Sequence, residues 1–75
     1  MMAFEHPTSV GVVALAKSGR GWTLQYAGRT QGRWNSPDAA AQAVARHETG
    51  LPEWDNHWEP VSPDIIDWRP LGASI

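Results

Sequence analysis

The sequence contains no cysteine, and no long hydrophobic run occurs in its 75 residues. Without cysteine there is no disulfide framework, no thiolate nucleophile and no cysteine-based zinc site. The longest mainly apolar stretch, residues 10–16, is too short and too interrupted by glycine for a signal peptide or a membrane-spanning segment. We therefore expect a cytoplasmic protein without a membrane anchor.

Sequence motifs for catalysis and nucleotide binding are also missing. His47 and Glu48 begin like the zinc-protease helix motif, but Leu51 stands where the second histidine must lie to share a face with the first. Neither a P-loop nor a G-x-G-x-x-G fingerprint occurs. Ser36 and Ser62 each precede a proline and are better explained as helix caps than as nucleophiles. We expect the protein not to be an enzyme.

A metal site would have to come from a short acidic stretch near the middle of the second half. Asp55, His57 and Glu59 alternate there and could converge as nitrogen and oxygen ligands. Solvated acidic loops are far commoner than metal sites, and these residues lack an established ligand spacing. We expect no metal and no cofactor.

Tryptophan is the residue that the sequence has in excess, with five in the chain. Each indole can bury about 150–250 Å². A domain of this size buries only about 60% of the surface of its unfolded chain, so it needs every large apolar group. We expect residues 1–75 to form one small domain with Trp22, Trp34 and Trp68 in its core, and with residues 1–7 and 72–75 flexible.

Alternation of side chains predicts strands in the first half of the chain. Trp22, Leu24 and Tyr26 fall on one face of a strand, with polar residues between them. Residues 10–17 are apolar and β-branched, residues 32–35 form a short third strand, and glycines between these segments suit hairpin turns. The pattern predicts an antiparallel sheet of three strands over residues 10–35.

Helix signals follow the predicted sheet. Ser36 can cap the first turn, Pro37 fits the first helical position, and Asp38 complements the positive N-terminal end. Gly50 and Pro52 stop the pattern, so we predict a helix over residues 37–48. The predicted fold is α+β, a three-stranded antiparallel sheet packed by one helix in the order β-β-β-α.

Prolines at positions 52, 60, 63 and 70 interrupt the rest of the chain and predict an irregular C-terminal arm. Residues 63–69 fit both a short helix, because a serine and a proline again precede an aspartate, and an edge strand, because two isoleucines follow. The pattern leaves these alternatives open.

Charge is distributed unevenly along the chain. Residues 1–35 hold four basic residues and one acidic residue, whereas residues 36–75 hold two basic and seven acidic residues. The basic residues of the first half could reach phosphates together from strand ends and turns, while nearby aromatic rings could stack on bases. This alternative function, nucleic-acid binding, would use Lys17, Arg20, Arg29 and Arg33.

A stretch of the chain resembles a known family. Residues 34–41, with Thr49, Gly50 and Trp54 downstream, are similar to the S-P-x-A-A … T-G … W stretch of RAMA-type domains, small modules associated with DNA restriction and modification. The resemblance covers about residues 34–54, and Leu51-Pro52-Glu53-Trp54 replaces the Asn-Gly-Trp segment of that family. It implies a strand-rich, DNA-associated module.

Protein binding is the function that the sequence favours. Two tryptophans lie in an acidic segment, and aromatic residues bordered by charge are typical of binding hot spots. They also fit a small satellite core folded over the helix. The partner is either another protein or a second copy of the chain. The predicted protein-binding residues are Glu53, Trp54, Asp55, His57, Trp58 and Glu59.

Overall fold

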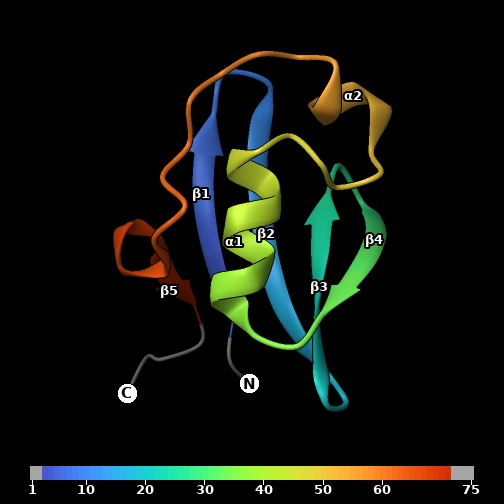
Figure 1. Ribbon diagram of the computed structural model, residues 1–75, viewed down its shortest axis with the longest axis vertical. Coiled ribbons are helices and arrows are strands. Elements are labelled where there is room, and N and C mark those ends of the chain that lie inside the picture. The colour runs from blue at the N-terminus through green and yellow to red at the C-terminus, as the bar shows by residue number, and fades with distance from the viewer. Residues whose placement is uncertain (1–2, 72–75) are drawn as a thin grey trace.

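The computed structural model describes residues 3–71, with Leu71 described for its backbone only, and its sheet has five strands. The strand order is β4-β3-β2-β1-β5, and every neighbouring pair is antiparallel (Figure 1). The flexibility predicted for residues 1–2 and 72–75 lies outside the described residues. The strands are β1 (Ala3–Thr8), β2 (Gly11–Ser18), β3 (Gly21–Tyr26), β4 (Arg29–Trp34) and β5 (Arg69–Leu71).

The prediction of a three-stranded sheet is therefore wrong, because the sheet has two further strands, β1 and β5. Residues 3–7, expected to be flexible, belong to β1, where Phe4 lies opposite Leu15 and His6 opposite Val13 in β2. Glu5 and Pro7 alternate with these residues and make the segment look too polar for a strand. Strand β5 has three residues, and it forms by pairing with β1. Such a pairing between the chain's two ends leaves no local pattern in the sequence.

The central hairpins of the sheet agree with the sequence prediction. The alternation of Trp22, Leu24 and Tyr26 in β3 is confirmed, with the first two of these side chains buried. Strand β4 starts at Arg29, three residues before the predicted start, because the preceding turn is short. A β-bulge follows, and Gly32 in it has a φ of +77°. A Cβ at this position would also collide with the ring of Trp34. Both the positive φ and this close contact therefore require glycine.

Helix α1 (Pro37–Ala45) begins as predicted and ends three residues early. Its cap is confirmed, because Ser36 Oγ accepts a hydrogen bond from the Ala39 N–H at 3.1 Å. The helix stops because His47 adopts a left-handed φ of +57°. The N–H of His47 then donates to Val44 O and that of Glu48 to Ala43 O, which is a Schellman ending. The prediction looked for glycine in this role and therefore placed the end too late.

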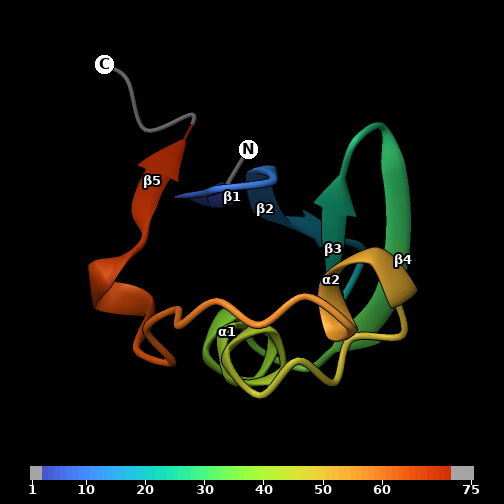
Figure 2. The ribbon, with the colours of Figure 1, turned by 90° about the horizontal axis from the view of Figure 1, so that it is seen from above.

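Helix α1 covers one face of the sheet. Its buried residues Ala40, Ala41 and Val44 belong to the same core as Leu15 and Leu24 of the strands. Alanine is small enough to let a helix backbone approach a sheet closely. Figure 2 shows α1 and the chain between α2 and β5 on the same side of the sheet. Within residues 3–71, no helix covers the opposite face.

The C-terminal arm contains short elements and one buried tryptophan. They are helix α2 (Pro52–Asp55), a single 3-10 turn η1 (Ile65–Asp67) and β5. Residues 63–69 thus contain both a helical turn and the start of a strand. Trp68 is buried between them, and its indole N–H donates to Ser62 O at 3.1 Å. No helix among residues 3–71 is long and apolar enough to span a bilayer.

Candidate functional site

Trp54 of the predicted binding segment belongs to the core. Its side chain is fully buried, and its indole N–H donates to Val44 O at 2.9 Å. The ring of His47 stacks on it with a centroid distance of 4.5 Å and an interplanar angle of 14°. Trp54 therefore joins α2 to the end of α1 and offers no surface to a partner.

Glu53 forms an ion pair with Arg29 of β4. The two side chains are each about half exposed. This contact connects a residue predicted to bind protein with one predicted to bind nucleic acid, so the two predicted sites meet at this point. The pair lowers the net charge that either residue presents to an outside ligand, while both side chains stay partly exposed.

Asp55 closes the turn between α1 and α2. Its carboxylate accepts hydrogen bonds from the Thr49 N–H at 3.0 Å, the Thr49 hydroxyl at 2.8 Å and the Gly50 N–H at 2.8 Å. The Thr49 hydroxyl in turn accepts from the Leu51 N–H at 3.1 Å. All of these donors belong to the fold, so Asp55 stabilises a loop and does not face a partner.

His57 and Glu59 connect the segment after α2 to the turn between β1 and β2. Glu59 accepts hydrogen bonds from the Ser9 N–H at 3.0 Å and from the Ser9 hydroxyl at 2.5 Å. The Nε2 atom of His57 lies 3.1 Å from Glu59 Oε1 and 3.2 Å from Ser9 Oγ. The hydrogen bonds from Ser9 and His57 lower the pKa of Glu59 below its ordinary value, although partial burial opposes this shift.

The geometry of Ser9, His57 and Glu59 differs from that of a catalytic triad. In a triad the serine and the carboxylate contact opposite nitrogens of the imidazole, so that one proton can be taken while the ring is held. Here both contact Nε2. The cluster ties a hairpin to a loop. Sequence reasoning missed Ser9, because it lies about fifty residues away and no local pattern marks it.

Trp58 is the large apolar residue of the predicted binding segment that remains exposed. Its exposed fraction is 76%, and its ring lies 5.0 Å from that of His47 at an angle of 39°. Its chain neighbours His57 and Glu59 are held on Ser9, so the backbone on both sides of Trp58 is anchored. Ile66, in η1, is exposed to a similar extent at 80% but lies in a different part of the arm.

The predicted basic site divides into two parts. Lys17, Arg20 and Arg33 surround the turn between β2 and β3, at the opposite end of the molecule from α2 (Figure 1). Arg29 lies at the other end of β4, beside Glu53. Within residues 3–71, no carboxylate comes within ion-pair distance of the three cations at the turn. The Arg33 side chain lies over Gly21, with its Nε only 3.0 Å from where a Cβ would stand.

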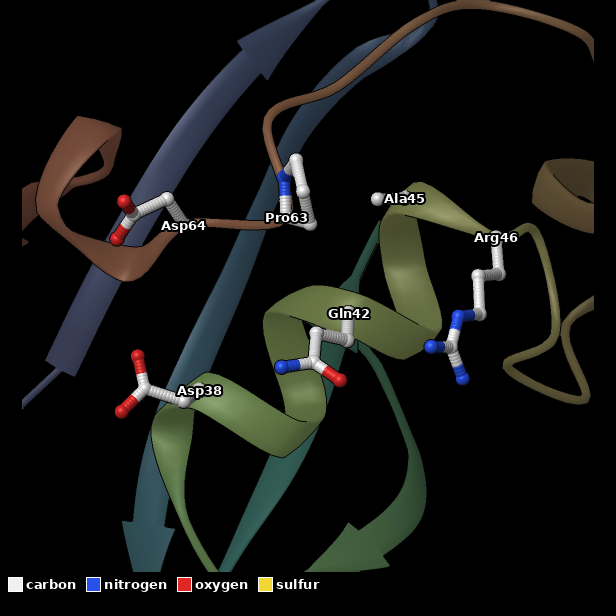
Figure 3. Close-up of a pocket in the computed structure, with 6 residues that line it drawn as sticks. All are labelled: Asp38, Gln42, Ala45, Arg46, Pro63 and Asp64. Atoms are coloured by element: carbon white, nitrogen blue, oxygen red, sulfur yellow. The ribbon is translucent and has the colours of Figure 1, made fainter.

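A groove also runs along the outer face of α1 (Figure 3). Its polar lining comes from Asp38, Gln42 and Arg46 of the helix and from Asp64 opposite. The two carboxylates lie at one end and the guanidinium at the other, so the groove does not carry charge of a single sign along its length. Within the part of the chain that the structure describes, no cluster of three metal-ligating side chains occurs. Asp55 faces Thr49, whereas His57 and Glu59 face Ser9.

Comparisons with protein-family models, with curated proteins and with solved structures found no match to this chain. The resemblance of residues 34–54 to RAMA-type domains therefore stays a prediction. Two surfaces of the described residues are candidates for a functional contact: the exposed indole of Trp58 and the cations around the β2–β3 turn.

Proposed function

We propose that the protein is a non-enzymatic protein-binding module whose main contact is Trp58. The observation behind this proposal is that the other large side chain of the segment, Trp54, is fully buried while Trp58 is 76% exposed. A domain this small gains stability from each aromatic group that it buries. An indole left in solvent next to a well-packed one is therefore better explained by contact with a partner than by folding.

The surroundings of Trp58 suit such a contact. The residues before and after it are anchored on Ser9, and its ring rests against His47. An anchored side chain loses less conformational freedom on binding than a mobile one, and tryptophan is among the commonest hot-spot residues. The polar neighbours of Trp58 in the chain, His57 and Glu59, are both hydrogen-bonded within the fold.

Peptide display is the direct test of this proposal. A library panned on the wild-type protein should yield peptides that bind it. These peptides should bind the Trp58→Ala variant more weakly, by at least about 2 kcal/mol of binding free energy. The matched control is Ile66→Ala, which removes a similarly exposed apolar side chain elsewhere in the arm. Equal binding to wild type and Trp58→Ala would contradict the proposal.

Sedimentation velocity decides whether the partner is a second copy of the chain. If self-association is the function, the wild-type protein dimerises at micromolar concentration and Trp58→Ala does not. A monomeric wild type that binds selected peptides would assign the site to a different protein. A cytoplasmic location belongs to the same proposal, because a chain without cysteine suits a reducing compartment.

Nucleic-acid binding is the second candidate, and a specific observation favours it. Lys17, Arg20 and Arg33 gather at one turn and, among residues 3–71, lack ion-pair partners. Cations so placed can release counterions from a nucleic-acid backbone, which makes binding strongly dependent on salt. The resemblance to RAMA-type domains points in the same direction.

A salt titration with labelled single- and double-stranded DNA tests the second candidate. Binding through the turn predicts an affinity that falls steeply with salt, and a slope that flattens when Arg20 and Arg33 are replaced by alanine. Arg29→Ala is the matched control, because Arg29 is paired with Glu53 and lies at the far end of β4. An affinity that Arg29→Ala reduces as much as Arg33→Ala would rule out a site confined to the turn.

A further inference from the structure

His47 adopts a left-handed backbone conformation with a φ of +57°. This conformation is uncommon for residues other than glycine, although asparagine, aspartate and histidine adopt it more often than the rest. Glycine would end α1 at this position without strain. What histidine adds at this position is its side chain, and both nitrogens of the imidazole ring have partners.

Both ring nitrogens of His47 face backbone carbonyl oxygens. Nδ1 lies 3.0 Å from Trp54 O, and Nε2 lies 2.9 Å from Glu59 O. A carbonyl oxygen only accepts hydrogen bonds, and a neutral imidazole has only one N–H to donate. One nitrogen of a neutral ring would thus point its lone pair at an oxygen. Both hydrogen bonds form together only when the ring carries two protons.

The geometry points to His47 as a positioning residue that acts as an imidazolium: with both nitrogens protonated it restrains the Trp58 segment through two carbonyl groups, and loss of one proton loosens that segment, which stays tied to Ser9. The inference deepens the proposed function by naming a regulator of the Trp58 surface, and rests on that function in its last step only. The loosening of the segment itself is independent of any partner.

The aromatic neighbours of His47 favour the charged ring. It lies between Trp54, stacked at 4.5 Å, and Trp58, tilted at 5.0 Å. The faces of both indoles attract cations through the negative charge of their π-systems. The same ring therefore joins a fully buried tryptophan to an exposed one, and its position sets where the exposed indole rests.

Other charged groups near His47 are engaged elsewhere or directed to solvent. On its own turn, Arg46 and Glu48 are exposed. On α2, Asp55 accepts from Thr49 and Gly50. In the loop beyond, His57 and the carboxylate of Glu59 face Ser9. Among residues 3–71, no side-chain carboxylate forms a hydrogen bond or ion pair with His47.

The two carbonyl groups that contact His47 differ in their other interactions. Trp54 O also accepts from the His57 N–H at 3.0 Å, and Trp54 is anchored by its buried ring. Glu59 O receives its hydrogen bond from His47. When one proton leaves, Trp54 stays fixed by its buried ring, whereas Glu59 keeps only the tether of its side chain to Ser9, so the contact to Glu59 is the one that loosens. Histidine is the side chain whose charge ordinarily changes near neutral pH, so the segment should be held more tightly when the ring carries two protons than when it carries one.

NMR of the full-length protein tests this inference. Across about pH 5 to 8, both ¹⁵N atoms of His47 should be protonated at the acidic end, and the Glu59 carbonyl ¹³C shift should follow the loss of one proton. The Trp54 carbonyl should move less. The heteronuclear NOE of the Trp58 indole N–H should fall along the same curve, as the ring becomes more mobile.

Two variants separate His47 from the other histidine of this region. His47→Asn, which tolerates a positive φ, should abolish the pH response of Trp58. His57→Gln, which can still donate to Glu59, should preserve it. A Trp58 response that vanishes in His57→Gln, or a His47 ring with a single N–H at the acidic end, would overturn the inference. Peptide display, by contrast, decides the proposed binding function, so the two can fail separately.

Discussion

The two ends of the molecule treat their charges in opposite ways. At the α2 end, the acidic groups Glu53, Asp55 and Glu59 all have partners inside the fold. At the β2–β3 end, the cations of Lys17, Arg20 and Arg33 have no ion-pair partner among residues 3–71. The sequence alone predicted protein binding through the acidic segment and, as the alternative, nucleic-acid binding through the basic residues of the first half. The folded chain leaves mainly an indole available at one end and mainly cations at the other.

The largest expected effect concerns the core of the α2 end. Trp54→Ala should destabilise the protein by about 3–5 kcal/mol, because it removes a fully buried ring and its hydrogen bond to Val44 O. Trp58→Ala, the matched change at an exposed position, should cost less than about 1 kcal/mol. Urea unfolding followed by circular dichroism measures both. Similar unfolding midpoints for the two variants would contradict the assignment of Trp54 to the core and Trp58 to the surface.

A smaller loss is expected when the loop before α2 loses its carboxylate. Asp55→Asn keeps the shape of the side chain but weakens the acceptors of the Thr49 and Gly50 N–H groups. Hydrogen bonds to charged groups contribute about 1.5–3 kcal/mol each, and the amide retains part of this, so we expect a loss of about 1–2 kcal/mol. Glu48→Gln, at an exposed position without a side-chain hydrogen bond or ion pair among residues 3–71, is the control in the same urea assay. Equal losses would remove the distinction between engaged and free carboxylates.

The tether between Ser9 and Glu59 should show itself as a dependence of stability on pH. Hydrogen bonds from Ser9 and His57 lower the pKa of Glu59 from its ordinary value of 4.5. A carboxyl with a lowered pKa stabilises the folded state above its ordinary pKa, and this contribution is lost as pH falls through the lowered value. Between pH 4.5 and lower values, the wild type should therefore lose more stability than Glu59→Gln does. Parallel curves for the two proteins would contradict the tether.

The sequence predicted the parts of this fold that depend on neighbouring residues. The alternation in β3 and the cap of α1 at Ser36 follow from local rules, and both are confirmed. Strand β5 was missed because it forms by pairing with β1 across the length of the chain. Strand β1 pairs with the neighbouring β2, and it was missed because Glu5 and Pro7 make its sequence look too polar for a strand. The end of α1 was misplaced because the residue in the left-handed conformation is His47, whose stacking on Trp54 compensates for the strain.

The candidate site was predictable to a smaller extent. The segment around Trp58 was found from its composition, but composition does not distinguish Trp54, fully buried, from Trp58, largely exposed. The hydrogen-bond donors to its acidic residues include Gly50 and Thr49, 5 and 6 residues from Asp55, Arg29, 24 residues from Glu53, and Ser9, 50 residues from Glu59. The longer separations leave no periodic signal. His47 was considered as part of an incomplete zinc motif, and no interaction of its ring with the Trp58 segment was predicted. Its role depends on two carbonyl groups that meet only in the folded chain.

The smallest expected effect concerns the ion pair that joins the two predicted sites. Arg29 and Glu53 are both about half exposed, and exposed pairs contribute about 0.2–1 kcal/mol because solvent screens them. A double-mutant cycle of Arg29→Ala and Glu53→Ala, measured by urea unfolding at low and high salt, should give a coupling energy in this range that shrinks as salt rises. The same cycle with Arg33 in place of Arg29 should give no coupling, since Arg33 lies at the other end of β4. Coupling of Glu53 to Arg33 as strong as to Arg29 would mean that the acidic and basic ends are not separate, and the contrast between them would then have to be abandoned.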